Sequence, residues 1–442
     1  MPVQTLLWVR RPTQVMDYAQ RVYGPTFTLK LPALQLVLTS DRDAIRTMFA
    51  AKADDMHAGR FNRILRPLVG DSSLLLRDGA AHMQRRKLLM PAFHGERMRF
   101  YGNTMAEITR RTIARWREGE VFALHKHTQE ITLQVILRTV FGADSGVLDP
   151  LSHTIKRMML RAEQPLSLVP LIYLASHPEQ QDKAPWRWLL VQKNETDAML
   201  YALIRAGRQG LRAGRKDVFA MLLEARDEQG RGLSDDDLRD ELMTALAAGH
   251  ETTATSLAWA VERLLANPDA YRSARDEVRA LGAEPEPEQL NALPYLDALI
   301  KEVLRMRPVV PLVGRVLMKP YHLAGYDLPA GTPLGACIYL AQRNPDVYPE
   351  PDAFRPERFL DKTPDPASYF PFGGGLRRCI GAAFAQYEMK IVLGTMLANC
   401  DFELAQPSPV RVVRRAITFS PEGGTRVRVH GLKTSSRLHQ VA

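Results

Sequence analysis

The chain has 442 residues, 45% of them hydrophobic and 24% charged, a balance that excludes a disordered or fibrous protein. Its three cysteines are too few for a disulfide framework or for the four thiolates of a plant-type iron–sulfur cluster, so we expect a reducing compartment, the cytoplasm. The formal net charge of +10 raises nucleic acid, an anionic membrane or an acidic protein as partners. Because the basic residues are scattered and no basic-plus-aromatic module is found, we expect no nucleic-acid binding.

A single domain spanning residues 1–442 is expected, because no Ser/Gly-rich or Pro-rich linker and no repeat divides the chain. Near the N-terminus, a brief apolar run at 6–9 is followed by two arginines, so neither a signal peptide nor a membrane span is expected there. The polar tail from about Lys433 is expected to be disordered.

The predicted elements are mostly helices. After an amphipathic stretch to about Tyr23, alternating β-prone residues at 27–39 predict a hairpin. Apolar residues then recur at helical spacing through 43–281, and β patterns return at 315–340 and 402–429. The sequence therefore predicts a mainly α fold with a minor β portion (α+β).

One helix is predicted to be unusually long. Ser234 is a good N-cap with three aspartates in the first turn, and the pattern runs without proline to Asn267, where Pro268 stops it. At 1.5 Å per residue the helix would be about 50 Å long, enough to cross the whole domain.

The middle of this helix has a composition that a plain structural helix does not favour, since Gly costs about 1 kcal/mol and paired Thr residues lose side-chain freedom. Ala248 and Gly249 would leave room over a flat cofactor, while a Thr hydroxyl can bond the preceding turn and bend the helix. Glu251 and Thr252 would then form an acid–alcohol pair that relays protons toward dioxygen. A mere kink or packing groove is the alternative, and His250 is expected to be structural.

A glycine-dense run at 372–381 contains Cys379, with Arg377 and Arg378 directly before it and a helix pattern behind it. Glycines let the chain turn tightly and bring amide N–H groups toward the sulfur, and positive charge favours thiolate over thiol. The segment therefore predicts a metal held by one thiolate, for which an inert buried Cys is the alternative.

This segment resembles the haem-ligand signature of the cytochrome P450 family, Phe-x-x-Gly-x-Arg-x-Cys-x-Gly, matched at Phe372, Gly375, Arg377, Cys379 and Gly381. The Ala-Gly-x-Glu-Thr-Thr stretch is similar to the oxygen-activation motif of the same family. The resemblance covers essentially the whole chain. It implies the cytochrome P450 fold, with the long helix crossing a buried haem b whose iron Cys379 binds.

Two further groups of residues are implied by the resemblance. Glu302 and Arg305, three apart on a helix that opens near Pro294, would join Arg358 of the Pro-Glu-Arg-Phe element in a buried structural network. The haem propionates need cations, which the resemblance assigns to four residues: His82, Arg86, Arg315 and Arg377.

The function implied is that of a soluble bacterial haem-thiolate monooxygenase. It would insert one oxygen atom from O2 into a C–H bond (hydroxylation) or double bond of a lipophilic substrate such as a fatty acid, terpenoid or steroid. Electrons would come from a ferredoxin or flavodoxin with an NAD(P)H-dependent reductase. A peroxide-driven peroxygenase is one alternative, although peroxygenases lack the acid–alcohol pair, and a non-enzymatic haem sensor or carrier is the other.

The resemblance also places the surfaces of the site. Arg85, Lys87 and Arg378 would line the face where an acidic electron donor docks. The walls of an apolar substrate pocket would come from five segments: 56–76, 163–203, 244–249, 309–313 and 416–419.

Overall fold

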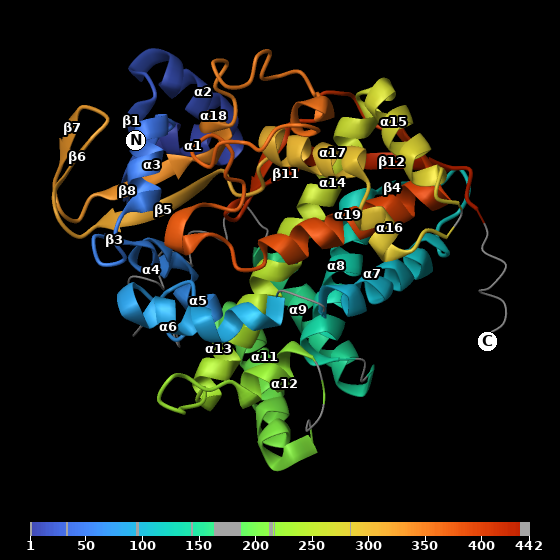
Figure 1. Ribbon diagram of the computed structural model, residues 1–442, viewed down its shortest axis with the longest axis horizontal. Helices are drawn as coiled ribbons and strands as arrows, with labels where there is room; N and C mark the ends of the chain where they lie inside the picture. Colours follow the sequence, from blue (N-terminus) through green and yellow to red (C-terminus); the bar gives the residue numbers. More distant parts are fainter. Residues whose placement is uncertain are drawn as a thin grey trace.

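The structure of the protein, a computed structural model, describes residues 2–31, 34–93, 97–142, 145–162, 187–211, 215, 217–282 and 284–433. The predicted disordered tail lies, apart from Lys433, outside the described residues. Helices make up most of the described ranges, and short strands form four small sheets within them (Figure 1). The mainly α fold with a minor β portion is therefore confirmed.

The described helices are α1 (Pro2–Arg10), α2 (Pro12–Tyr23), α3 (Arg42–Ala50), α4 (Ala58–Phe61), α5 (Arg66–Val69), α6 (Gly79–Leu89), α7 (Arg97–Ile113), α8 (Leu124–Phe141), α9 (Ser145–Ala162), α11 (Arg187–Ala206), α12 (Val218–Glu224), α13 (Asp235–Gly249), α14 (Glu251–Leu265), α15 (Pro268–Arg279), α16 (Pro287–Asn291), α17 (Pro294–Met306), α18 (Ile338–Ala341) and α19 (Ala382–Asn399). The strands are β1 (Thr26–Leu31), β2 (Leu34–Thr39), β3 (Met56–His57), β4 (Val121–Ala123), β5 (Leu312–Leu317), β6 (Tyr321–Leu323), β7 (Tyr326–Leu328), β8 (Pro333–Cys337), β9 (Asp401–Leu404), β10 (Val412–Arg415), β11 (Thr418–Pro421) and β12 (Arg426–His430).

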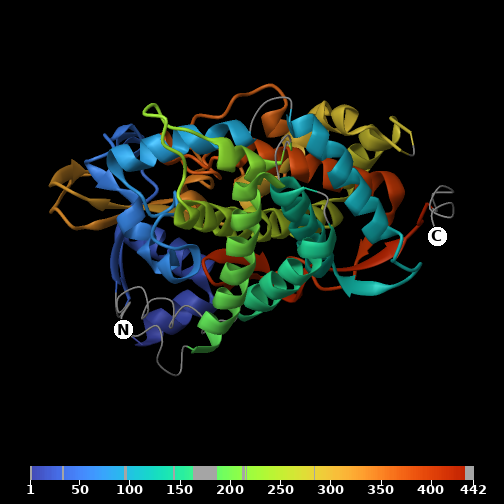
Figure 2. The same ribbon diagram turned by 90° about the horizontal axis from the view of Figure 1, so that it is seen from below.

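The largest sheet has the strand order β1-β2-β8-β5-β3 and lies at one end of the molecule, with the β4-β12-β9 sheet at the other (Figures 1 and 2). The predicted N-terminal hairpin is confirmed, since β1 and β2 pair antiparallel with Thr26 opposite Thr39 and Leu31 opposite Leu34. Strand β5 pairs antiparallel with β8 and carries Arg315 opposite Leu334.

Helix α14 lies in the middle of the helical part and contacts α8, α17 and α19. Trp259, which is fully buried in the main core, anchors this helix among its neighbours. Helix α19 is buried on nearly all of its faces, as expected for a helix whose apolar residues surround it rather than form one stripe. None of the described helices combines the length and the apolar character that a membrane span requires.

The long central helix begins as predicted but is not continuous. Ser234 caps α13 in a capping box with Asp237, whereas the helix breaks at His250, where φ is −106° and ψ −48°. The hydroxyl of Thr252 donates to the carbonyl of Ala248 at 2.9 Å, the bond to the preceding turn that the sequence predicts. From α8, Thr132 donates to the carbonyl of His250 at 3.0 Å, so the neighbouring helix stabilises the break.

Candidate active site

The loop before α19 is shaped by close packing against α3. A Cβ atom at Gly375, whose φ is +62°, would lie 2.2 Å from the carbonyl oxygen of Phe49, and one at Gly374 would lie 2.3 Å from the ring of Phe49. The N–H of Cys379 donates to the carbonyl of Phe372 at 2.9 Å. Glycine is therefore required for the turn that presents Cys379.

Cys379 is the exposed cysteine of the three, whereas Cys337 and Cys400 are buried. Desolvation raises the pKa of the Cys379 thiol, and the opposing effects of the Gly381 N–H and of the guanidiniums of Arg86 and Arg378 are smaller. The amide donor and the cations thus favour the thiolate as expected, but burial outweighs them. A metal cation would remove the thiol proton on binding, because the coordinating species is the thiolate.

Three of the four residues that are expected to bind the haem propionates lie together. His82, Arg315 and Arg377 line one pocket, and the side chain of Asp78 lies beside them. Burial and then Arg377 lower the pKa of Arg315 to about 10, while burial and the nearby arginines lower the pKa of His82 to about 3. The positive charges of this cluster therefore repel one another.

The positive charge of this cation pocket is not balanced within the described residues. Arg377 Nη2 lies 3.8 Å from Asp78 Oδ1, whereas Arg315 makes no ion pair there and donates from Nη1 to the carbonyl of Gly314 at 2.8 Å. Buried charges require counter-charges. The pocket thus fits an anionic group such as a carboxylate, and haem has two.

Arg86 and Arg85 of α6 have different surroundings. Arg86 donates to the carbonyl of Arg378 at 2.7 Å, so it lies beside the cysteine loop, and its charge also lowers the pKa of His82. Arg85 is only 6% exposed, with Nη2 2.6 Å from Asp237 of α13. The prediction that Arg85 lies on a docking face is wrong, because α13 covers it; Lys87 and Arg378 are exposed.

Ala248 and Gly249, next to the helix break, have different surroundings. Ala248 is exposed although α13 lies within the helical part of the molecule, whereas a Cβ at Gly249 would lie 3.0 Å from Ile136 of α8. The glycine therefore allows α8 to pack closely, and the expected room over a flat cofactor stays a prediction. His250 is buried, and its Nδ1 lies 2.7 Å from the carbonyl oxygen of Leu246, a structural role as expected.

Glu251 points toward α8. Its Oε2 accepts from Gln129 Nε2 at 2.7 Å, and its Oε1 accepts from Thr255 at 3.2 Å and lies 3.4 Å from His125 Nε2. Desolvation raises the pKa of Glu251, but hydrogen bonds and charge from His125, followed by Gln129, outweigh it and lower the pKa to about 2. Among the described contacts none joins this carboxylate to Thr252, so the structure does not bring the expected pair into direct contact.

Comparison with known proteins decides the family. A sequence model of the cytochrome P450 family matches residues 2–424. The chain belongs to the cytochrome P450 family.

Its relatives include cytochrome P450 135B1 of Mycobacterium tuberculosis, 39% identical over 99% of this chain and 91% of that protein. Cytochrome P450 137 of the same species is 35% identical over 92% of this chain and 83% of that protein. Among solved structures, the retinoic-acid-bound cyanobacterial CYP120A1 is 26% identical with a TM-score of 0.82, over 96% of this chain and 95% of that one. The family is one of haem-iron monooxygenases that use O2 and a redox partner, so this P450 is an oxidoreductase.

In this P450 the three residues of the expected buried network lie together. Arg305 contacts both oxygens of Glu302, with Nε 2.6 Å from Oε2 and Nη2 2.8 Å from Oε1. Arg358 Nε lies 3.5 Å from Glu302 Oε1, and the N–H of Arg355 donates to the same oxygen at 2.9 Å. Glu302 and Arg305 are fully buried, so the chain itself pairs these charges.

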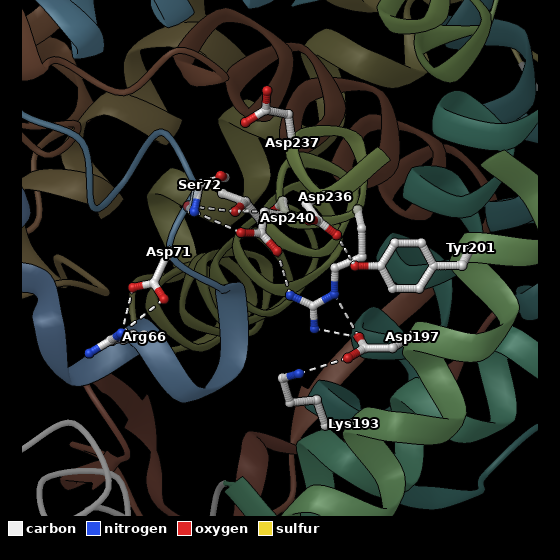
Figure 3. Close-up of polar contacts among 12 residues, drawn as sticks. Arg66, Asp71, Ser72, Lys193, Asp197, Tyr201, Asp236, Asp237 and Asp240 are labelled. Carbon is white, nitrogen blue, oxygen red and sulfur yellow. Dashed lines mark hydrogen bonds and ion pairs between the residues drawn. The ribbon is translucent and has the colours of Figure 1, made fainter. Parts of the chain in front are cut away.

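A second polar network of the P450 joins α13 to the loop after α5 and to α11 (Figure 3). Asp240 accepts from the N–H of Ser72 at 2.7 Å and from Arg239 Nη1 at 2.7 Å. Arg239 also donates from Nε to Asp197 of α11 at 2.7 Å, and Lys193 binds the same carboxylate. Sequence reasoning missed this network, because only the fold brings an Arg-Asp pair on a helix to partners on two other elements.

Several of the segments that are expected to line the substrate pocket meet one another. Ser73 and Thr244 share a hydrogen bond of 2.7 Å, so the segments 56–76 and 244–249 meet. The N–H of Phe419 donates to the carbonyl of Val309 at 2.7 Å, which places 416–419 beside 309–313. Of the remaining segment, residues 163–186 lie outside the described residues.

Proposed function

We propose that this P450 hydroxylates or epoxidises a lipophilic substrate such as a fatty acid, terpenoid or steroid, with haem b as its cofactor. The observation that carries the haem assignment is the accessible Cys379 close to the unbalanced cation pocket of His82, Arg315 and Arg377. The cyanobacterial relative is bound to retinoic acid, a lipophilic carboxylic acid, which supports the substrate class. The chain would act as a single cytoplasmic domain and receive electrons from a ferredoxin or flavodoxin with its NAD(P)H-dependent reductase.

Each group has a defined task in this proposal. Haem, when bound, would supply the oxygen chemistry, to which a thiolate ligand contributes electron density that favours O–O cleavage. Cys379 would bind the iron, while Arg315, Arg377 and His82 would bind and orient the propionates through charge-assisted hydrogen bonds. Thr252, whose hydroxyl bonds to Ala248 in the structure, would hand a proton toward the oxygen.

The substrate class is tested by titrating the oxidised holoenzyme with fatty acids, steroids and sesquiterpenes. A compound that binds next to the haem should shift the Soret absorption. It should then be oxidised when ferredoxin, reductase, NAD(P)H and O2 are supplied. If only hydrophilic compounds shift the spectrum, the proposed substrate class is wrong.

The role of Thr252 is tested with Thr252→Ala. Haem and substrate binding should remain, while reducing equivalents are diverted to peroxide or water because proton delivery is mistimed. Thr253→Ala is a matched control, since this neighbouring hydroxyl is buried. Full coupling of NAD(P)H use to product in Thr252→Ala would show that the hydroxyl only bends the helix.

A further inference from the structure

A line of hydrogen bonds leads away from Glu251 through two buried residues to the β10–β11 hairpin. Thr255 donates to Glu251 Oε1 at 3.2 Å, and Thr255 Oγ1 lies 3.0 Å from Nε2 of His125. On the other side of the ring, Nδ1 of His125 lies 3.2 Å from Nη1 of Arg415. His125 is 1% exposed and Thr255 0%, whereas Arg415 is half-buried. The line therefore connects the interior with a residue that reaches solvent.

The partners of His125 determine where its ring hydrogen lies. A guanidinium has only donors, so Nδ1 of His125 accepts from Arg415 and the ring carries its hydrogen on Nε2. Nε2 then donates to Thr255, whose hydroxyl is left to donate to Glu251. Since Gln129 also donates to Glu251, every bond of the line points toward this carboxylate.

Packing alone would not require a titratable group here. Two hydroxyls of the same helix already join α8 to the central helix, since Thr128 donates to the carbonyl of Ala254 at 2.9 Å and Thr132 donates to that of His250 at 3.0 Å. His125 differs from both in that it can accept a proton on one ring nitrogen and release one from the other. It also contacts the acid that precedes Thr252.

We infer that His125 is a proton-relay residue that supplies Glu251 from the Arg415 side of the molecule. The inference rests on the proposed oxygen-site role of Glu251 and Thr252, and it makes His125 a positioning residue because it acts through Glu251. When Arg415 turns away, a proton from hydronium binds Nδ1, which leaves a water molecule, and the Nε2 proton passes to Thr255. The hydroxyl proton of Thr255 passes to Glu251 Oε1.

This transfer moves one proton and no electrons. The imidazole is left neutral with its hydrogen on Nδ1, and it regains the starting tautomer by proton exchange with water, in which Nε2 gains one proton and Nδ1 releases one. The neutral Glu251 side chain must then rotate to reach Thr252, since no described contact joins the two.

The inference is tested with His125→Gln in the holoenzyme. Glutamine can still donate to Thr255 but takes up no proton near neutral pH. Coupling of NAD(P)H consumption to product should fall at least about tenfold in favour of peroxide, with unchanged substrate affinity. The matched control is His127→Gln on the same helix, because His127 accepts from Trp116 at 3.1 Å rather than bonding to the Glu251 line. Equal coupling in the two variants would overturn the relay.

A second measurement does not depend on turnover. Nitrogen NMR of 15N-histidine-labelled holoenzyme, assigned by the signal lost in His125→Gln, should show His125 as the Nε2–H tautomer near neutral pH. An Nδ1–H tautomer would overturn the inference. If Thr252→Ala stays fully coupled, the proposed oxygen-site role fails instead, and the tautomer still reports whether the hydrogen-bond line exists.

Discussion

Two buried charged clusters of this P450 differ in whether the chain balances their charge. In the Glu302, Arg305 and Arg358 network, one carboxylate contacts both guanidiniums and also accepts a backbone N–H. In the cation pocket, His82 and Arg315 are also buried but have Asp78 as their nearby carboxylate, which Arg377 contacts at 3.8 Å. A balanced cluster therefore needs no ligand to satisfy its charges, whereas an unbalanced one prepares a site for an anion.

The largest effect is expected when the balanced network is broken. Glu302→Gln leaves two guanidiniums close together without their counter-charge, so the free energy of unfolding should fall by about 3–5 kcal/mol. Urea denaturation measures it. Glu107→Gln removes an exposed ion pair with Arg111 and should cost less than about 1 kcal/mol. A similar decrease in the free energy of unfolding in both variants would show that burial of the network does not increase its contribution to stability.

Removal of a cation from the unbalanced cation pocket should weaken haem binding instead. Arg315→Ala loses a charge-assisted bond of about 1.5–3 kcal/mol to a propionate, so haem transfer to a scavenging apoglobin should be about tenfold to hundredfold faster. Arg46→Ala removes an exposed arginine of α3 and serves as the control. Unchanged haem transfer in Arg315→Ala would place the propionates elsewhere.

The repulsion within the cation pocket also predicts that the free energy of unfolding depends on pH. Since the pKa of His82 is lowered to about 3 from 6.5, the unfolded chain binds a proton between these values and the folded protein does not. Stability should thus be fully present above about pH 6.5 and fall as the pH is lowered. Between about pH 5 and 6.5, His82→Asn should reduce the pH dependence of the free energy of unfolding by at most about 1 kcal/mol per pH unit. This bound is below the full effect of one proton because solvent screens the charges.

The urea midpoint at several pH values measures this slope. His153→Gln replaces an exposed histidine and should leave it unchanged. Haem should reduce the effect, because a propionate beside His82 raises its pKa. An identical slope in His82→Asn and the parent protein would contradict the assignment of a neutral, electrostatically repelled His82.

The smallest effect is expected for cations outside both clusters. Lys87 is exposed and pairs with Glu228 at 3.1 Å, so its charge is largely screened. Lys87→Glu should slow the first electron transfer from a limiting acidic ferredoxin by roughly twofold to fivefold at low salt, and less at high salt. Substrate affinity should not change. A rate insensitive to both salt and charge reversal would move the docking face away from α6.

The sequence predicts best those features that local spacing determines. The Cys379 loop, the capping of α13 by Ser234 and the pairing of Glu302 with Arg305 three residues later all depend on neighbours in the chain. The direction of Glu251 could not be predicted, because its partner Gln129 is 122 positions away on α8.

Distant helices also determine what covers other residues. Arg85 is covered by α13, and Gly249 faces Ile136 of α8, although helical periodicity places each residue on a definite face. Periodicity indicates which residues share a face, but it does not indicate which element covers that face. The line through His125 was missed for the same reason, since a single histidine in a helix carries no motif.

The assignment of haem-thiolate chemistry to this P450 requires Cys379 as the iron ligand. Carbon monoxide bound to the reduced holoenzyme should give the red-shifted Soret band of thiolate ligation, and Cys379→Ser should lose that band. The buried Cys400→Ser is the control and should retain it. A histidine-type band in the intact protein, or a thiolate band that persists in Cys379→Ser, would contradict the account.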